Sequence, residues 1–400
     1  MTTRVQPALR RVRGHPARLA WALVVLAALV AAAALLGDRL VSGEATAARP
    51  ELQRILDDAV TGSGRIAPGA AAYVSGPHGT WVGAAGLANV GTRAPMGSEA
   101  RVRLESVSKI YTAAVVVQLD QERRLRLEDT VERWLPGLFP YGDRITIRQL
   151  LTMSSGLVDD NDLLASPAAA RAYLANVRDE ALRARLTAIA ARIERDPTVE
   201  ISPTWAVRFA AWQPLLFEPG TAYHYSNIGY DVLGLIAARA GGRPFPALLR
   251  ERLFVPLGLE DTAYDPQGPI AGPHATGYQV AADGSMTDVS DVHPWKGPDG
   301  GVVADADDTA AFLTALMRGR LVDADHLRRM RLDALWLGGE DSGCAGDAYG
   351  WSGGGNGYKT NVWVNRDGTR VAVLLLNARV TGDGADARAS TAMRRLYCAA

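Results

Sequence analysis

The sequence predicts an α+β fold, in which an antiparallel sheet built from both ends of the folded region is flanked by helices and receives an inserted all-helical layer. Strand signals near both ends of the 400-residue chain and helical periodicity between them support this fold class. A third observation, an apolar run behind a cluster of arginines, predicts a membrane-spanning helix at the N-terminus.

The apolar run is Leu19–Leu36, which contains no charged residue and follows five arginines between positions 4 and 18. Such a run can cross a bilayer once, and positive charge before it holds the N-terminus in the cytoplasm. We expect 1–18 to be a cytoplasmic basic segment, 19–40 a transmembrane anchor or signal peptide, and 41–50 a linker. The protein is then a single-pass cell-membrane protein with its folded part outside the cytoplasm, or is secreted if Ala45-Thr46-Ala47 is cleaved. A buried soluble helix is the alternative.

Export makes the two cysteines informative. An oxidising compartment allows Cys344 and Cys398 to form a disulfide, and two unpaired buried thiols are the alternative. The composition of the whole chain, 48% hydrophobic and 22% charged with balanced formal charge, is that of a folded enzyme. It shows no excess of basic residues of the kind that nucleic-acid-binding proteins have. We therefore expect no nucleic-acid partner.

The folded region begins with Glu51–Val60, whose apolar residues have helical spacing. Ala70–Ser75 and Thr80–Leu87 then flank a Gly-Pro-His-Gly turn and predict a hairpin. At the other end, Thr360–Val364 and Arg370–Asn377 flank a turn that contains Asp-Gly, a strong hairpin signal. Both ends of the domain are thus expected to supply strands.

Helical spacing fills the region between these strands. We expect one domain over 51–400, with a sheet layer from 51–105 and 296–400 and a helical layer from 106–295. The Ala- and Arg-rich stretch 163–200 is expected to add a helical hairpin, either a lid over the active-site cleft or a surface insertion. The clearest expected helices are Ser106–Gln121, Ile147–Met153, Ala181–Ile193, Asn227–Ala240, Phe245–Leu253 and Thr309–Met317.

Ser106-Val107-Ser108-Lys109 is the first motif that carries chemistry. A serine and a lysine three residues apart lie on one face of a helix, so the amine can reach the hydroxyl. A serine hydroxyl needs an adjacent base, and a desolvated lysine can lose its proton. Of 43 basic residues only three are lysine, so a lysine at this position is informative. The backbone N–H groups at a helix N-terminus point toward a developing oxyanion.

Two further motifs follow. Tyr225-Ser226-Asn227 offers a phenol that can pass a proton and an amide that can orient a bound group. The alternative is that the tyrosine only packs at the start of a helix. The glycine-rich run Gly350–Tyr358 lets a substrate backbone approach closely if it is a strand, or is a flexible turn. None of the six histidines forms a metal-ligand cluster, so neither a metal nor a cofactor is expected.

The order of these motifs resembles the superfamily of serine β-lactamases and penicillin-binding D,D-peptidases. Within it, the chain looks closest to the D-alanyl-D-alanine carboxypeptidases of actinomycetes. The likeness covers about 51–400 apart from 163–200, and several phrases outside the motifs share it. These are Gly86-Leu87-Ala88, Ile145–Leu151 with Ser155-Gly156-Leu157, and Pro256-Leu257-Gly258-Leu259.

The resemblance implies an acyl-enzyme on Ser106, with proton transfer shared by Lys109 and Tyr225. It implies that Asn227 binds the substrate amide and that the N–H groups of Ser106 and Gly354 form the oxyanion hole. A disulfide between Cys344 and Cys398 also matches the actinomycete enzymes. The substrate would be a small molecule or a peptidoglycan peptide.

The third motif departs from the family pattern, which usually has Lys or His where this chain has Trp351-Ser352-Gly353. An indole cannot replace that cation, so the substrate-binding residues Trp351, Ser352 and Gly353 are altered. Lys359-Thr360-Asn361 is an alternative third motif on the following strand. A third motif of the form Trp-x-Gly resembles the third motif of carboxylesterases built on this fold. The sequence therefore leaves three functions open, namely a D,D-carboxypeptidase-like or β-lactamase-like hydrolase, a carboxylesterase, and a non-catalytic penicillin- or muropeptide-binding protein.

Overall fold

The computed structural model describes residues 49–61, 65–164, 166–193, 202–265, 269–281, 283–290, 296–332, 337–341, 344, 347–355, 357–380 and 384–400. The chain divides into the units Met1–Ala47 and Ala48–Ala400, and every described residue belongs to the second. The expected basic segment 1–18, the membrane-spanning segment 19–40 and most of the linker 41–50 lie outside the described residues. No helix within the described ranges is long and apolar enough to span a bilayer.

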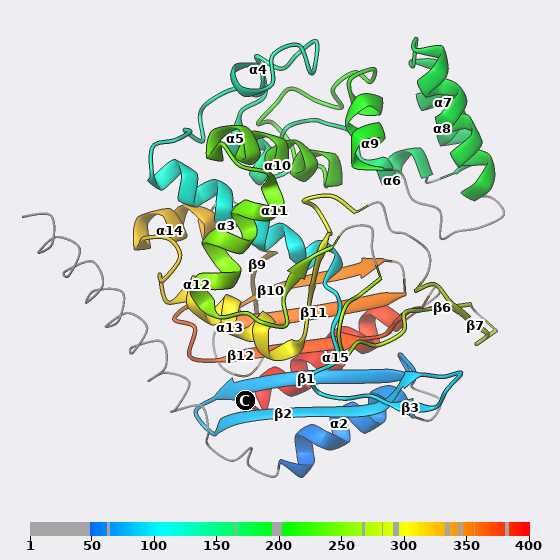
Figure 1. Cartoon of the computed structure of the whole chain (residues 1–400), viewed down its shortest axis with the longest axis vertical. Coiled ribbons are helices and arrows are strands. Elements are labelled where there is room, and N and C mark those ends of the chain that lie inside the picture. The colour runs from blue at the N-terminus through cyan, green and yellow to red at the C-terminus, as the bar shows by residue number, and fades with distance from the viewer. Residues whose placement is uncertain are drawn as a thin grey trace, which may run out of the picture. The chain divides into compact units, whose positions relative to one another are not determined.

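A seven-stranded sheet forms the centre of the fold (Figure 1). Its strands are β1 (Gly69–Gly76), β2 (Gly79–Asn89), β3 (Ala94–Pro95), β9 (Leu337–Asp341), β10 (Asp347–Gly355), β11 (Tyr358–Asn365) and β12 (Val371–Leu376). They lie in the order β3-β2-β1-β12-β11-β10-β9, with every pairing antiparallel. The pairing of β1 with β12 joins the two ends of the domain, which confirms the predicted antiparallel sheet.

Helices cover the sheet and form a second layer. In chain order they are α2 (Pro50–Val60), the 3₁₀ turn η1 (Glu105–Val107), α3 (Ser108–Gln121), α4 (Val131–Trp134), α5 (Ile147–Leu151), α6 (Asp160–Leu164), α7 (Pro167–Ala175), α8 (Glu180–Ile193), α9 (Pro203–Ala210), α10 (Asn227–Gly241), α11 (Phe245–Leu249), the π turn η2 (Arg250–Phe254), α12 (Val255–Leu257), α13 (Ala306–Met317), α14 (Ala324–Leu332) and α15 (Ala385–Cys398). The insertion 163–200 supplies α7 and α8, which pack against each other as predicted.

The two faces of the sheet pack against different helices because side chains alternate along each strand. On one face, Ala72 of β1 and Leu374 of β12 belong to a core shared with α2 and α15. On the other face, Ala71 and Val373 belong to a larger core that includes α3 and α13. The strand β12 is therefore apolar at every position, since both of its faces are buried.

Helix α10 positions two of the predicted site residues. Ser226 caps its N-terminus, because Ser226 Oγ accepts a hydrogen bond from the Gly229 N–H at 3.2 Å. Gly242 ends the helix with a φ of 65°, a left-handed conformation that glycine adopts without steric cost. The cap fixes Tyr225 just before the helix and Asn227 at its first residue.

Short strands within 106–295 depart from the expectation of an all-helical layer. They are β5 (Ala263–Tyr264), β6 (Tyr278–Val280) and β7 (Met286–Asp288), and they pair in two small sheets with β4 (Val102–Arg103), β8 (Val302–Ala304) and β13 (Ala378–Val380). The sheet orders are β13-β6-β7 and β4-β8-β5. Strands of two or three residues are too short to show a period-two pattern, so no such pattern predicts them.

Candidate active site

Ser106 lies on a short turn between β4 and α3. It is the middle residue of η1, and the regular helix begins two residues later at Ser108, whereas the sequence predicted a helix from Ser106 onward. Glu105, directly before it, has a φ of 53°, a left-handed conformation that is strained in a residue with a side chain. Such a conformation persists only where surrounding contacts hold it, so the turn is a fixed support for Ser106.

Lys109 comes one helical turn after Ser106 and directs its amine to the same place. Its Nζ lies 3.2 Å from Ser106 Oγ. It also donates hydrogen bonds to Asn227 Oδ1 at 2.7 Å and to the Asp299 carbonyl oxygen at 2.9 Å. The side chain is almost completely buried, so protein groups rather than bulk water surround its amine.

The charge state of Lys109 differs from the expectation that burial frees its amine. Burial does lower the pKa of this side chain, but Tyr225, Asp299 and Asp159 raise it, and the net shift is upward. The Asp299 carboxylate acts at short range, since its Oδ2 lies 3.6 Å from Lys109 Nζ. Lys109 is therefore held as an ammonium group that donates hydrogen bonds.

Tyr225 also contacts the Ser106 hydroxyl. The Tyr225 Oη lies 2.7 Å from Ser106 Oγ, within hydrogen-bond distance. The Lys109 ammonium lies 5.1 Å from the centre of the Tyr225 ring, a distance at which a cation and an aromatic face attract each other. The serine hydroxyl thus lies between a phenol and an ammonium group.

Asn227 uses both ends of its side-chain amide inside the protein. Its Oδ1 accepts a hydrogen bond from Lys109, and its Nδ2 donates one to Asp160 Oδ1 at 2.9 Å. Its backbone N–H donates to Asp159 Oδ1 at 2.7 Å, and burial, together with the neighbouring Asp160, raises the pKa of Asp159 to about 8. Asn227 therefore orients Lys109, and only one of the two N–H groups on its Nδ2 is used by Asp160.

A buried pair of carboxyl groups lies behind Lys109. Asp299 Oδ1 accepts a hydrogen bond from the Gly297 N–H at 3.0 Å, and the other carboxylate oxygen, Oδ2, faces Lys109. Burial, and then the neighbouring Asp299, raise the pKa of Asp231 well above its ordinary value, so Asp231 is neutral. A Cβ at Gly297 would overlap Asp231 Oδ1, so only glycine fits at this position. The sequence analysis did not identify this pair.

The glycine-rich run is the strand β10, and it packs directly against the turn that carries Ser106. A Cβ at Gly353 would overlap the Leu104 carbonyl oxygen and lie 2.9 Å from the Ser106 nitrogen. The buried Trp351 donates a hydrogen bond from Nε1 to the Ser106 carbonyl oxygen at 2.8 Å. This part of β10 therefore supports the nucleophile turn, with Trp351 beneath it.

The other predicted residues of the third motif lie around the edge of β10. Ser352 has an exposed side chain, and Gly354 lines a cavity beside Ser106. Lys359, the start of the alternative motif, pairs with Gly354 from the neighbouring strand β11. Its ammonium group lies 2.8 Å from Asp386 Oδ1, so its charge is neutralised by the start of α15.

The cavity beside Ser106 has a volume of about 340 Å³ and a strongly polar lining. Tyr225 and Asn227 line it together with two cations, Lys296 and Arg379. Lys296 Nζ lies 3.5 Å from the buried Glu105, and Arg379 Nη1 lies 3.6 Å from Asp386. Two other segments of the chain therefore bring cations to the site, each paired with a carboxylate, and Glu105, Asp160 and Asp299 line the same cavity.

Sequence reasoning missed these cations because each comes from a segment without a recognised motif. One signal was available for Lys296, since it is one of only three lysines in a chain with 43 basic residues. All three, Lys109, Lys296 and Lys359, lie at the cavity or on the strand next to Gly354. No comparable signal existed for Arg379.

The two cysteines lie far from each other in sequence and close in space. Cys344, in the segment that leads into β10, forms a disulfide with Cys398 at the end of α15. The bond closes a loop of 54 residues that contains β10, β11 and β12. It thus joins the strands that support Ser106 to the helix that covers their outer face.

Two curated relatives align with part of this chain. Penicillin-binding protein 4* of Bacillus subtilis (strain 168) is 28% identical over 177 residues, which are 44% of this chain and 33% of that protein. Esterase EstB of Burkholderia gladioli is 31% identical over 186 residues, which are 45% of this chain and 43% of that protein. The alignments therefore span between a third and less than half of the length of these relatives.

A solved structure resembles nearly the whole domain. A D-stereospecific amidohydrolase from Streptomyces superposes with a TM-score of 0.69 at 25% sequence identity, covering 88% of this chain and 99% of that chain. The β-lactamase family model matches residues 52–394, which include the sheet, the helical layer and the Ser106 site. The chain therefore belongs to the β-lactamase family and is a serine hydrolase of the β-lactamase fold.

Proposed function

We propose that this protein hydrolyses carboxylate-bearing substrates through an acyl-enzyme on Ser106, in the manner of a D-alanyl-D-alanine carboxypeptidase or a β-lactamase. The observation that carries the proposal is the presence of Lys296 and Arg379 in the cavity beside Ser106. A guanidinium can bind a carboxylate through two parallel hydrogen bonds. Both D-alanyl-D-alanine peptides and penicillins carry such a carboxylate.

The contacts of Ser106 suggest the path of the proton. As Ser106 Oγ attacks the carbonyl carbon, Tyr225 Oη accepts its proton at 2.7 Å and passes the phenolic proton to the leaving nitrogen. The C–N bond breaks, and the acyl group stays on Ser106 as an ester. Water then attacks the ester by the reverse path and releases the acid.

Lys109 is proposed to act as a fixed positive charge in both steps. Its ammonium group donates to Ser106 Oγ and lies over the Tyr225 ring, so it stabilises negative charge on either oxygen. The N–H groups of Ser106 and Gly354 are proposed to hold the carbonyl oxygen as it becomes an oxyanion. Gly354 lines the cavity, and its neighbour Gly353 packs against the Ser106 nitrogen.

The comparisons support amide substrates with D configuration. The structural relative from Streptomyces is a D-stereospecific amidohydrolase, and the B. subtilis relative is a penicillin-binding protein. Together with the cations, they favour a peptide or lactam over a neutral ester. We further propose that the protein works outside the cytoplasm, anchored or secreted, because the disulfide is stable in an oxidising compartment and Leu19–Leu36 suits export.

Carboxylate selection is tested with an N-acylated D-alanyl-D-alanine peptide and its C-terminal amide. We expect the wild-type protein to cleave the free acid about 10- to 100-fold faster in kcat/KM, because a charge-assisted hydrogen bond is lost in the amide. Arg379→Gln should lose most of this preference. Arg388→Gln, which removes an exposed arginine of α15, should keep it. Equal cleavage of acid and amide by the wild-type protein contradicts the proposal.

Trp351 favours a second candidate, a carboxylesterase. Esterase EstB is 31% identical over its aligned part, and the third motif of this chain lacks the usual cation. This function predicts that short-chain aryl esters are turned over faster than D-alanine is released, with no effect of Arg379→Gln. D-alanine release that equals or exceeds ester turnover excludes it. Loss of every activity in Ser106→Ala excludes a protein that only binds penicillin or muropeptides.

A further inference from the structure

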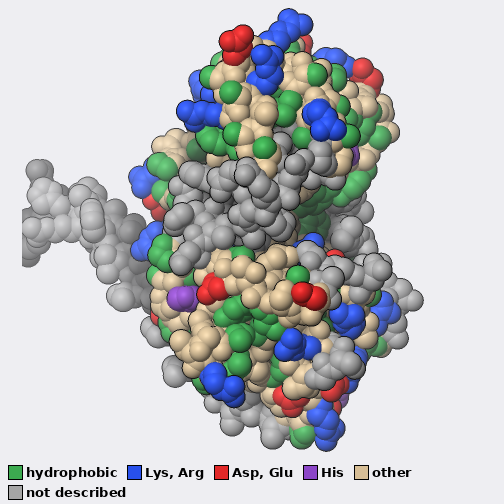
Figure 2. All heavy atoms as spheres, turned by 90° about the vertical axis from the view of Figure 1, so that its right-hand side faces the viewer, with side chains coloured by type: hydrophobic (Ala, Val, Ile, Leu, Met, Phe, Trp, Pro, Cys, Tyr) green, Lys and Arg blue, Asp and Glu red, His purple; other side chains and the backbone are tan. Residues whose placement is uncertain are grey.

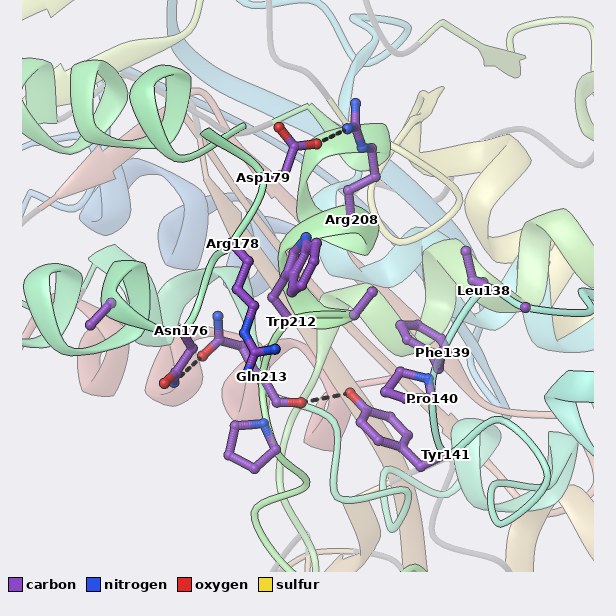
Figure 3. A pocket seen from close by; sticks show the side chains of 14 residues that line it. Leu138, Phe139, Pro140, Tyr141, Asn176, Arg178, Asp179, Arg208, Trp212 and Gln213 are labelled. Carbon is purple, nitrogen blue, oxygen red and sulfur yellow. Dashed lines mark hydrogen bonds and ion pairs between the residues drawn. The ribbon is translucent and has the colours of Figure 1, made fainter. Parts of the chain in front are cut away.

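A second cavity, of about 1010 Å³, lies where the insertion meets the rest of the helical layer (Figure 3). Three segments line it, namely the loop 137–141, the turn 175–179 between α7 and α8, and residues 208–214 at the end of α9. None of its lining residues lines the cavity beside Ser106. It is therefore a feature of the insertion that the catalytic site does not explain.

Hydrogen bonds within the wall of this cavity give it a fixed shape. The buried Gln213 accepts a hydrogen bond at its Oε1 from Asn176 Nδ2 at 2.8 Å. The single Tyr141 O–H is shared between the backbone oxygens of Ala210 and Gln213, which lie 2.8 and 3.0 Å from Oη. These bonds join all three lining segments, so the cavity is preformed.

The charged groups of the cavity leave a net positive charge. Asp179 accepts a hydrogen bond from Arg208 at 2.6 Å, which neutralises both side chains. Arg178 is exposed and has no hydrogen-bond or ion-pair partner among the residues that the structure describes. Figure 3 shows Arg178 and Trp212 extending into the space that Phe139 and Pro140 face from the other side.

The surface around the cavity also carries more positive than negative charge. Between 167 and 185 the chain has four arginines and two acidic residues, and Figure 2 shows basic side chains gathered over this end of the domain. The apolar part of the lining includes Trp212, whose side chain is 39% exposed although it is large and aromatic. A flat apolar group can stack on this indole while an anionic group reaches Arg178.

We propose that this cavity, formed in part by the insertion 163–200, is a second binding site that takes a small anionic ligand with a flat apolar body. Arg178 binds the anion, and Trp212, with Phe139 and Pro140 opposite, binds the body. The site lies apart from the Ser106 cavity, so its occupancy does not require catalysis.

The test uses a matched pair of fluorescent probes, 1-anilinonaphthalene-8-sulfonate and the uncharged N-phenyl-1-naphthylamine. The wild-type protein should bind the sulfonate with a stoichiometry of one. Arg178→Ala should weaken sulfonate binding by about tenfold or more and leave the binding of the neutral probe unchanged, because only the charged contact is lost. Trp212→Ala should weaken both probes.

Arg171→Ala is the matched control, since Arg171 is an exposed arginine of α7 that does not line the cavity. It should bind both probes like the wild-type protein, and all three variants should keep the wild-type unfolding temperature. Unchanged sulfonate affinity in Arg178→Ala overturns the proposal, as does an equal loss in Arg171→Ala. Displacement of the sulfonate when Ser106 is acylated by a penicillin also overturns it, since the probe would then occupy the catalytic cavity.

Discussion

Lys109 illustrates how a buried amine can keep its proton. Desolvation alone favours the neutral amine, but oxygen atoms of Ser106, Asn227 and Asp299 surround Nζ within 3.2 Å. The Asp299 carboxylate adds a negative charge at 3.6 Å, and the net pKa shift is upward. The lysine is therefore better suited to stabilise negative charge on Ser106 and Tyr225 than to remove a proton.

Replacement of Asp299 by Asn tests this balance. Asn keeps the backbone acceptor but removes one of the charges that raise the pKa of Lys109, so this pKa should be lower than in the wild-type protein. We expect kcat/KM of the wild-type protein to show no loss due to Lys109 up to about pH 10, since the ordinary lysine value is already about 10.4. The variant should lose activity at a lower pH than the wild-type protein.

Asp325→Asn is the control, because it removes an exposed carboxylate of α14. Its pH profile should match that of the wild-type protein. An Asp299→Asn profile that keeps its alkaline limb in place, or moves it to higher pH, contradicts the charge assignment of Lys109.

The sequence identified those site residues whose partners are close in the chain or belong to a motif. Ser106 and Lys109 are one helical turn apart, and Tyr225 and Asn227 flank a helix cap, so local spacing was sufficient. Asp299 lies just before β8, which pairs with β4 and β5, and Arg379 lies on β13, which pairs with β6, so both reach the site through tertiary pairing that spacing cannot reveal. The upward shift in the pKa of Lys109 is caused by Tyr225, Asp299 and Asp159, and the last two lie outside the sequence motifs.

Strand β10 is the element that connects the sheet to the chemistry. Its glycines allow the Ser106 turn to approach so closely that Gly353 has no room for a side chain. Trp351, two residues earlier, holds the same turn through a hydrogen bond to the Ser106 carbonyl. The position of Ser106 thus depends on the surface of β10 as much as on α3.

Gly353→Ala tests whether β10 positions Ser106. Its Cβ would overlap Leu104 and approach the Ser106 nitrogen, so the turn must move, and a displacement of this size can reduce the rate about 100-fold. We expect that loss in the acylation rate, measured by stopped-flow fluorescence. Ser352→Ala, at the neighbouring exposed position, should change the rate less than about twofold. Equal rates for Gly353→Ala and the wild-type protein contradict the role of β10.

Long elements were predictable and short ones were not. The predicted strand pairs at both ends correspond to β1–β2 and β11–β12. The predicted helices correspond to α2, α3, α5, α8, α10, α11 with the π turn η2, and α13. The 3₁₀ turn before α3 and the strands β5 to β7 are two to three residues long, so no periodic pattern can develop in them. Their existence depends on tertiary pairing.

At the scale of the whole molecule, buried carboxyl groups determine how stability changes with pH. Burial raises the pKa of Asp159 to about 8, that of Asp305 to about 7 and that of Asp308 to about 6. In the unfolded chain these groups ionise near pH 4. Between pH 4 and 8 the folded state therefore binds more protons than the unfolded state.

The free energy of unfolding should consequently fall as the pH rises from 5 to 8. Urea titrations at pH 5, 6, 7 and 8 measure it, and we expect the midpoint to decrease along this series. Asp159→Asn should flatten the decrease between pH 7 and 8, whereas Asp283→Asn, at an exposed carboxylate, should not. A midpoint that rises from pH 5 to 8 contradicts the assignment of neutral buried carboxyl groups.

The acylation of Ser106 connects the fold, the contacts of the site and the proposed function. Fluorescent penicillin incubated with the purified domain, followed by digestion and mass spectrometry, measures it directly. We expect one adduct, on the peptide that contains Ser106, and no adduct in Ser106→Ala with unchanged folding. An adduct on another residue, or substrate turnover that persists in Ser106→Ala, would contradict the assignment of Ser106 as the nucleophile.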